Sequence, residues 1–257
     1  MIDLAFTLSG FVVGAIVGMT GVGGGSLMTP LLVLLFGVSP ATAVGTDLLY
    51  AAVTKAGGVV VHSRRRHVRW DIVARLAAGS VPGALLTLAV LGSAHIDHAA
   101  FSKIVTETLG VALILTALAI VGKNHLQRWG RLATDARRER WIGPLTVLVG
   151  LVLGVLVTLS SVGAGALGVA ALFFLYPRLP TVHIVGSDIA HAVPLTLVAG
   201  LGHAQLGTVD WTLLASLLVG SLPGIWLGST LSARVPERLL RSGLASLLVV
   251  VGGKLVL

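Results

Sequence analysis

The sequence predicts an all-α integral membrane protein with about ten helical segments, some short or re-entrant, in two inverted five-helix repeats. Three observations predict this class. The 257-residue chain is 55% hydrophobic and 11% charged, with a mean hydropathy of +0.98, so its charges are too few to cover a soluble globule. Its apolar runs are continuous rather than alternating, which is typical of helices in lipid. Many residues of the first half recur in order in the second half.

Ten apolar segments follow one another along the chain. They lie at 3–19, 26–36, 41–61, 71–92, 101–121, 143–159, 165–176, 184–202, 211–230 and 239–257. A membrane span needs roughly 20 residues. The segments 26–36 and 165–176 would reach only about 18 Å, which is short of a hydrocarbon core of about 30 Å. We therefore expect these two segments to be half-helices or re-entrant arms.

The duplication relates residues at a nearly constant offset, and it predicts a first repeat at 1–121, a basic linker at 122–142 and a second repeat at 143–257. Gly10, Gly14, Val22, Gly23 and Gly25 recur 140 positions later as Gly150, Gly154, Val162, Gly163 and Gly165. At an offset of 141, the residues Gly45, Asp47, His62, Trp70, Gly79, Ser80, Pro82 and Gly83 match Gly186, Asp188, His203, Trp211, Gly220, Ser221, Pro223 and Gly224. Glycines spaced four apart predict close packing between helices.

Charge predicts that the two repeats have opposite orientations. The loop 62–69 carries four arginines, whereas the equivalent loop 203–210 has no Lys or Arg. In the other loop pair the basic loop belongs to the second half instead, because 93–100 has no Lys or Arg while 232–241 carries three arginines. Basic loops stay in the cytoplasm, so the linker 122–142 is expected inside and both termini outside the inner membrane. The net charge of +8 thus reflects topology, and nucleic-acid binding is not expected.

Two glycine-rich interruptions at equivalent positions form the predicted substrate site. Residues 20–26 interrupt the first hydrophobic hairpin, and residues 160–165 interrupt its counterpart. Paired breaks in inverted repeats mark a midplane site, and the amide groups at the following helix N-termini would bind an anion. The alternative is two tight hairpin turns without a ligand. The candidate substrate-binding residues are Thr20, Gly23, Gly24, Gly25, Ser26, Lys55, Ser160, Ser161, Gly163 and Gly165.

These motifs together resemble the TauE/SafE sulfite-exporter family over essentially the whole chain. The residues that carry the resemblance are GMTGVGGGSLMTPLLV at 18–33, GTDL at 45–48, GSVPGALL at 79–86, and the second copies GSDIA and GSLPGIWLG. The resemblance implies a cytoplasmic-membrane transporter associated with export of sulfite, organosulfonates or related small anions. The second copy has Ala164 and Ala166 where the first has Gly24 and Ser26, so its amide cradle is expected to be less open.

Asp47 and Asp188 are duplicated acids within apolar spans, and such acids indicate function. A bare carboxylate would repel an anion, so each must be protonated, pair with a cation or cap backbone amides. We leave open whether they cap helices or couple transport to a proton or cation. Tyr50 aligns with His191 on the same helices and adds a proton-capable pair to these candidate coupling or gating residues.

Lys55 lies eight residues after Asp47, on nearly the same helical face. Its ammonium would either attract an anionic substrate or neutralise Asp47. The equivalent residue is Thr196, so the site is expected to be asymmetric. Lys103 and Glu107 have the spacing of an ion pair within a helix, and we assign that pair a structural role.

The remaining duplicated residues fit structural roles. Trp70 and Trp211 are expected to be interfacial anchors, and Pro82 and Pro223 are expected to kink their helices. His62 and His203, at loop entrances, are expected to form interfacial hydrogen bonds.

Competing classes fit less well. The chain has no cysteine, HExxH or GxSxG motif, so an enzyme is not expected, and no cofactor or metal site is predicted. The alternative function is divalent-cation transport through Asp47, Asp188, His183 and His191, although cation sites usually gather more acids. The expected partners are a small anion, membrane lipid, a coupling proton or cation, and a second copy of the chain in a homo-oligomer.

Overall fold

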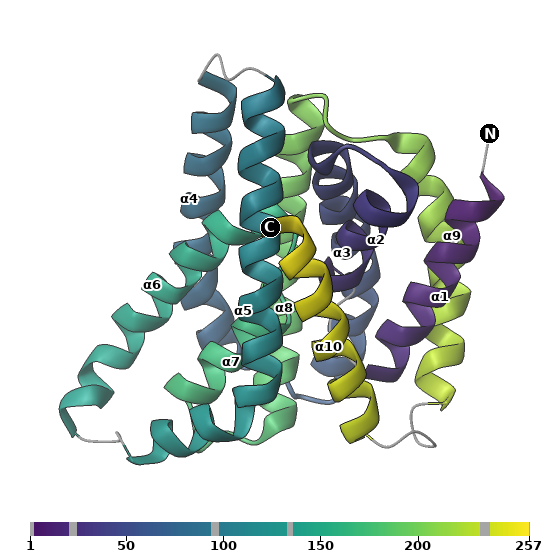
Figure 1. Ribbon diagram of the computed structural model, residues 1–257. Helices are drawn as coiled ribbons and strands as arrows, with labels where there is room; N and C mark the ends of the chain where they lie inside the picture. Colours follow the sequence, from purple (N-terminus) through teal and green to yellow (C-terminus); the bar gives the residue numbers. More distant parts are fainter. Residues whose placement is uncertain (1–2, 21–24, 94–97, 133–135, 232–236, 257) are drawn as a thin grey trace.

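The computed structural model describes residues 3–20, 25–93, 98–132, 136–231 and 237–256. Within these ranges the chain forms helices joined by short turns, and no strand is present (Figure 1). The helices are α1 (Leu4–Thr20), α2 (Gly25–Phe36), α3 (Pro40–Arg64), α4 (Trp70–Ser93), α5 (His98–Leu132), α6 (Ala136–Ser160), α7 (Ala166–Leu175), α8 (Thr181–Gln205), α9 (Trp211–Leu231) and α10 (Glu237–Val256). Each helix covers one of the predicted apolar segments. The predicted all-α membrane class is confirmed.

Six helices among the described residues are long and apolar enough to cross a membrane: α3, α4, α8, and parts of α5, α6 and α9. Large apolar side chains face outward on several of them, including Leu86 at 62% exposure and Val121 at 72%. Lipid rather than water therefore suits the outer surface. The helices α2 and α7 have 12 and 10 residues, so the prediction that both segments are too short to span is confirmed.

The basic linker 122–142 is largely helical. Residues up to Leu132 continue α5, and α6 begins at Ala136, well before its apolar part. Lysine, arginine, glutamine and alanine are good helix formers, so charged residues can extend an apolar helix beyond the lipid. The sequence predicted the charge of this segment but assigned it no structure.

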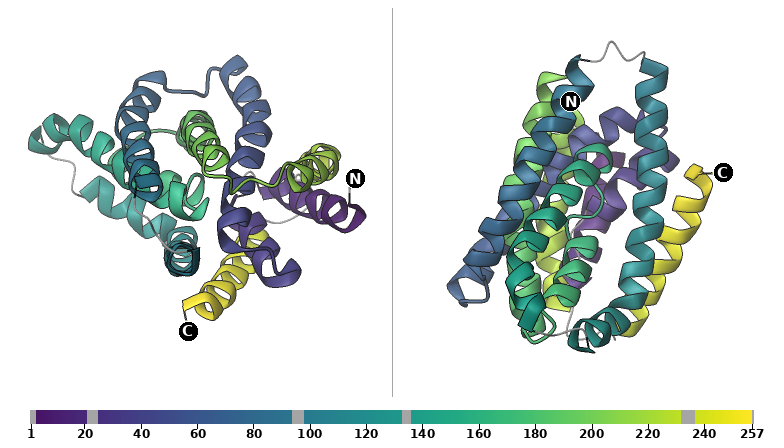
Figure 2. Two further views of the ribbon diagram at one scale, coloured as in Figure 1. Left: turned by 90° about the horizontal axis from the view of Figure 1, so that it is seen from above. Right: turned by 90° about the vertical axis from the view of Figure 1, so that its left-hand side faces the viewer.

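The two halves of the chain are interleaved rather than placed side by side as separate bundles. The helix α1 packs along α9, and α4 packs along α6, so each flanking pair takes one helix from each half. Seen from above, these pairs lie on opposite sides of α3 and α8, which pack against one another between them (Figure 2). The central residues of α3 and α8 are therefore enclosed by helices.

Glycines make the close contacts in both flanking pairs. A Cβ added at Gly10 or Gly14 would meet the carbonyls of Leu217 and Ser221 in α9. The equivalent glycines, Gly150 and Gly154, lie in the same way against the carbonyls of Leu76 and Ser80 in α4. The predicted glycine rows are thus confirmed as packing seams, and the two seams are related by the offset found in the sequence.

Equivalent helices of the two halves run in opposite directions. In Figure 1, α3 and α5 run from the upper to the lower end, whereas their counterparts α8 and α10 run from the lower to the upper end. The turn between α3 and α4, the end of α5, the start of α6 and the turn between α7 and α8 all lie at the lower end. The turn between α8 and α9 lies at the upper end. The orientation of these ends relative to the cytoplasm stays a prediction.

Gly220→Ala tests the close contact between α9 and α1. The added methyl group would meet the Thr7 carbonyl and lie 2.8 Å from the Phe11 nitrogen, both of which are backbone atoms that cannot move independently. We expect the free energy of unfolding to fall by about 1–3 kcal/mol, as in other overpacked contacts. Thermal unfolding of the purified protein in detergent measures the change.

Gly57→Ala is the matched control, because a Cβ at Gly57 in α3 meets no atom within 4 Å. It should leave the midpoint of unfolding unchanged or raise it slightly. Equal midpoints for the two variants would show that the α1–α9 seam is not as tight as described.

Candidate functional site

Two buried acids lie on the central pair of helices. Asp47 in α3 is 0% exposed, and Asp188 in α8 is 1% exposed. Both positions lie two turns into helices that begin at or directly after a proline, Pro40 for α3 and Pro180 for α8. Proline suits the first turn of a helix, where its missing N–H is not needed. Since α3 and α8 pack together, the sequence places both acids in the enclosed centre.

The residue before each acid connects its helix to the other half of the chain. Thr46 Oγ1 accepts a hydrogen bond from the Asp210 amide at 3.1 Å. Ser187 Oγ accepts one from the Arg69 amide at 2.9 Å. These two bonds are equivalent under the sequence offset. The hydroxyl residues that precede both acids therefore hold the loops before α9 and α4 in place.

The two acids have different surroundings. Asp47 Oδ2 accepts a hydrogen bond from Thr29 Oγ1 of α2 at 2.5 Å. Neither oxygen of Asp188 has a hydrogen-bond partner among the described residues. Its Oδ1 instead lies over Gly168 near the start of α7, where an added Cβ would collide with it. The two acids occupy equivalent positions in the sequence, but only Asp47 accepts a hydrogen bond from a described residue.

The second helix break has an unusual backbone. Ser161 has a φ of 57°, in the left-handed region that non-glycine residues rarely adopt, and Gly163 and Gly165 have φ values of 113° and 138°. Ser160 supports this turn, because its Oγ donates to the Leu156 carbonyl and accepts from the Val162 amide. Such conformations persist only where surrounding structure supports them, and they are common at functional sites.

The helix α7 begins at half-buried residues and has no side-chain cap. Gly165 at its N-cap makes no side-chain hydrogen bond to the helix. The first N–H groups of a helix have no partner within it, and together they carry a partial positive charge. The nearby Ser161 hydroxyl is buried and lies close to Asp47, but it makes no hydrogen bond of ordinary geometry with the described residues. This break therefore presents donors that an anion could use.

Lys55 connects the first half of the chain to this break. Its Nζ donates to the Ala164 carbonyl at 2.5 Å, directly before the α7 N-terminus. The side chain is buried, with the residue 7% exposed. It forms no ion pair with Asp47 or Asp188, although both carboxylates lie close enough to act on it electrostatically. A buried ammonium thus lies beside the start of a helix and near two acids.

The predicted proton-capable pair is also buried. The Tyr50 hydroxyl has no hydrogen-bond partner among the described residues. His191 Nε2 lies 2.8 Å from Ser80 Oγ of α4, while its Nδ1 has no partner in the described part of the chain. The structure brings Lys55 within electrostatic reach of both Asp188 and His191.

The first break lies largely outside the described residues. This applies to Gly23 and Gly24, and to the side chains of Thr20 and Ser26. The backbone of Thr20 ends α1, and that of Gly25 begins α2. Their substrate-binding role stays a prediction.

Comparison with known proteins identifies the family. A model of the family described as "Sulfite exporter TauE/SafE" matches residues 6–255. The chain belongs to the TauE/SafE family. It is therefore a multi-pass membrane protein of a transporter family. No solved structure matches the chain.

Several curated relatives are similar over nearly their whole length. A protein of Bacillus subtilis named "Probable membrane transporter protein YjnA" is 40% identical over 99% of this chain and 100% of its own. A second B. subtilis protein, "Probable membrane transporter protein YdhB", is 30% identical over 91% of this chain and 92% of its own. "Probable membrane transporter protein MJ0441" of Methanocaldococcus jannaschii is 23% identical over 95% of this chain and 91% of its own. The printed names agree on transport across a membrane.

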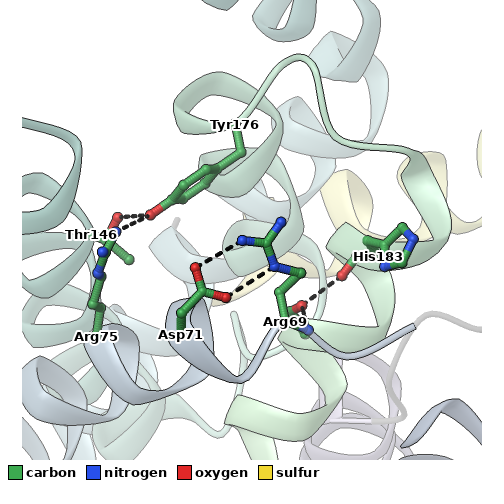
Figure 3. A network of polar contacts seen from close by, with 7 residues as sticks. Arg69, Asp71, Arg75, Thr146, Tyr176 and His183 are labelled. Carbon is green, nitrogen blue, oxygen red and sulfur yellow. Dashed lines mark hydrogen bonds and ion pairs between the residues drawn. The ribbon is translucent and has the colours of Figure 1, made fainter. Parts of the chain in front are cut away.

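The lower end of this TauE/SafE protein carries polar clusters that the sequence did not single out. The Tyr176 hydroxyl, in the turn between α7 and α8, lies 2.8 Å from Thr146 Oγ1 and accepts a long bond of 3.5 Å from Arg75 (Figure 3). Arg69 forms an exposed ion pair with Asp71 at 3.0 Å (Figure 3). At the equivalent positions of the first half, Phe6 and Phe36 form an aromatic contact with ring centroids 4.9 Å apart. A hydrogen bond and an aromatic pair thus occupy equivalent places.

The duplicated histidines also differ. His203 Nε2 donates to the Thr158 carbonyl at 2.9 Å, and its Nδ1 lies 2.8 Å from Thr208 Oγ1. His62 Nδ1 has no partner among the described residues, and its ring lies near His67, which in turn contacts His183. No group of three or more His, Asp or Glu side chains in the described part of the chain is arranged to hold a metal ion. The predicted hydrogen-bonding role is thus confirmed for His203 alone.

Two further predictions concern exposed positions. Lys103 and Glu107 form the expected pair within α5, with Nζ and Oε1 3.8 Å apart and both side chains exposed. Trp70 and Trp211 are exposed at the starts of α4 and α9, as interfacial anchors would be.

Thr29→Ala tests the bond that distinguishes Asp47 from Asp188. The substitution would remove the hydroxyl that Asp47 Oδ2 accepts from and would leave a buried carboxylate without a described donor. We expect a loss of about 1–3 kcal/mol in the free energy of unfolding. Thr87→Ala is the matched control, because the buried Thr87 hydroxyl bonds only to the Gly83 carbonyl of its own helix. A larger loss in Thr87→Ala than in Thr29→Ala would contradict the assignment.

Proposed function

We propose that this TauE/SafE protein is a secondary transporter that exports a small sulfur oxyanion, such as sulfite or an organosulfonate, across the cytoplasmic membrane. The family description supplies the substrate class. The chemistry of the second helix break supports an anion. The proposal treats the chain as a transporter without enzymatic activity of its own.

The observation that carries the proposal is the position of the buried Lys55 beside an uncapped, half-buried helix N-terminus. Its ammonium lies on the Ala164 carbonyl, one residue before the Gly165 N-cap of α7. Helix N-termini and ammonium groups both attract anions, and their effect is stronger away from bulk water. A divalent cation would instead be repelled by Lys55 and by the positive end of α7.

The interleaved halves support alternating access. Equivalent glycines make equivalent contacts in the α1–α9 and α4–α6 pairs, and equivalent hydroxyls bond to the opposite loops. In transporters built from inverted repeats, one arrangement opens the site to one side and its counterpart opens it to the other. We infer that the two breaks approach one another near the middle of the membrane and share one substrate.

Liposome flux tests this function. Purified protein in liposomes should carry sulfite, and Lys55→Met should raise the apparent KM about tenfold, because the loss of one favourable charge interaction of about 1.4 kcal/mol has this effect. Lys103→Met removes an exposed lysine instead and should transport as the unmodified protein does. Parallel assays with sulfate, chloride and Mg²⁺ define selectivity. Transport of Mg²⁺ without any transport of the sulfur oxyanions would overturn the proposal in favour of a cation carrier.

Cysteine labelling tests the proposed topology in this chain, which contains no cysteine of its own. Ser93→Cys at the end of α4 and His125→Cys in the basic extension of α5 are both at exposed positions. A membrane-impermeant maleimide added to intact cells should modify the first variant only, because Lys- and Arg-rich segments stay in the cytoplasm. Both termini should likewise be accessible from outside. Modification of both cysteines from the same side would contradict the inverted arrangement.

A further inference from the structure

Asp188 and Asp47 occupy equivalent positions, yet only one of them is bonded. Asp47 accepts from Thr29 Oγ1, whereas both oxygens of the 1%-exposed Asp188 lack a described partner. A buried ionised carboxylate without hydrogen bonds is costly, so such a group gains a proton or a cationic partner. Asp188 is therefore the acid whose surroundings favour the uptake of a proton.

The groups that face Asp188 can be named for each helix packed against it. The helix α3 supplies Lys55, and Asp47 and Tyr50 lie on the same helix; α8 itself supplies His191. From α4, Ser80 bonds to His191. The helix α7 and the apolar part of α6 contain no ionisable side chain. Lys55 is thus the one basic group of the described neighbourhood whose charge acts on Asp188.

The position of Lys55 connects this acid to the proposed anion site. Its ammonium bonds to the Ala164 carbonyl rather than to either aspartate, and Asp188 lies close enough to act on it electrostatically. A lysine side chain is long and flexible and carries a compact charge. The same ammonium can therefore add to the positive charge at the α7 N-terminus, or it can compensate a negative charge on Asp188.

We propose that Asp188 carries a proton that is co-transported with the anion, and that Lys55 couples the two events. When Asp188 is protonated, the charge of Lys55 is uncompensated and stays at the break, where it attracts the anion. When Asp188 loses the proton, its carboxylate compensates Lys55, and the anion is released. Proton and anion thus bind together, and by thermodynamic reciprocity each increases the affinity for the other. Asp47, held by Thr29, has a structural role.

This coupling is compatible with the export of a dianion such as sulfite. A dianion that moves with one proton still carries one negative charge, and a membrane potential that is negative inside drives that charge outward. The proton therefore reduces the electrical force on the anion without reversing it. This inference rests on the proposed anion transport, and the following experiment separates the two.

Binding of radiolabelled sulfite to the purified protein, measured from about pH 6 to about pH 8, tests the coupling. Affinity should fall by about tenfold as pH rises, within the usual range for coupling between two sites. Asp188→Asn should flatten this dependence. Asp47→Asn is the matched variant. Its affinity for sulfite can differ from that of the unmodified protein, but the ratio of its affinities at the two pH values should be the same. Sulfite itself changes protonation over this pH range, but this change is the same for every variant. It therefore does not contribute to the difference between the variants.

The outcomes are distinct. Absence of sulfite binding and flux in the unmodified protein would refute the proposed function. Two outcomes would refute the coupling while the protein still transports sulfite. In one, the pH dependence of sulfite affinity is unchanged in Asp188→Asn; in the other, it is lost in Asp47→Asn alone. In liposomes, acid on the side of the anion should speed flux in the unmodified protein and have no such effect in Asp188→Asn.

A second measurement is independent of whether the variants fold. Dicyclohexylcarbodiimide reacts with protonated carboxyl groups in apolar surroundings, and mass spectrometry locates the adduct in the unmodified protein. We expect modification of Asp188 in preference to Asp47. Preferential modification of Asp47, or of neither acid, would overturn the assignment.

Discussion

The structure depends on one constraint: polar backbone in a lipid-facing protein must be satisfied within the protein. The helices meet it along their length, but the connection between α6 and α7 does not, because it breaks the helical pattern within the apolar part of the chain. Ser160 satisfies part of this break through its bonds to the Leu156 carbonyl and the Val162 amide. Lys55 satisfies the Ala164 carbonyl from the other half of the chain. The N–H groups at the start of α7 are not satisfied by these bonds, and the proposed anion site rests on them.

Close packing makes such a break tolerable. The flanking pairs α1–α9 and α4–α6 approach so closely that glycines face backbone carbonyls of the partner helix. Helices in lipid associate through this kind of contact because there is no hydrophobic force between them. Pairing each half with the other also means that neither half can move as a separate bundle. Any change that exposes the break to alternate sides must therefore move the flanking pairs relative to α3 and α8.

Most of the fold could be predicted from the sequence because hydropathy and the repeated glycines are local signals. All ten helices fall on predicted segments, and the shortness of α2 and α7 followed from counting residues. Long-range partners could not be predicted in this way. The contact of Lys55 with Ala164 joins residues 109 positions apart, and helical spacing suggested Asp47 as its partner instead. Thr29 was missed because a threonine in a short apolar helix carries no pattern of its own, although its position next to a glycine-rich break was a usable signal.

The difference between the two halves is more informative than their likeness. A duplicated sequence predicts two equivalent half-sites, yet the structure gives Lys55 no basic counterpart, since Thr196 at that position bonds only within its own helix. Equivalent packing in the two halves allows two conformations of similar energy. A bound anion, in contrast, needs only one positive charge beside it. Two buried lysines would be costly, and one placed between the halves can act on both acids. The glycine seams are therefore equivalent in the two halves, while an unmatched lysine and a Thr29 bond to Asp47 alone make the centre of the protein asymmetric.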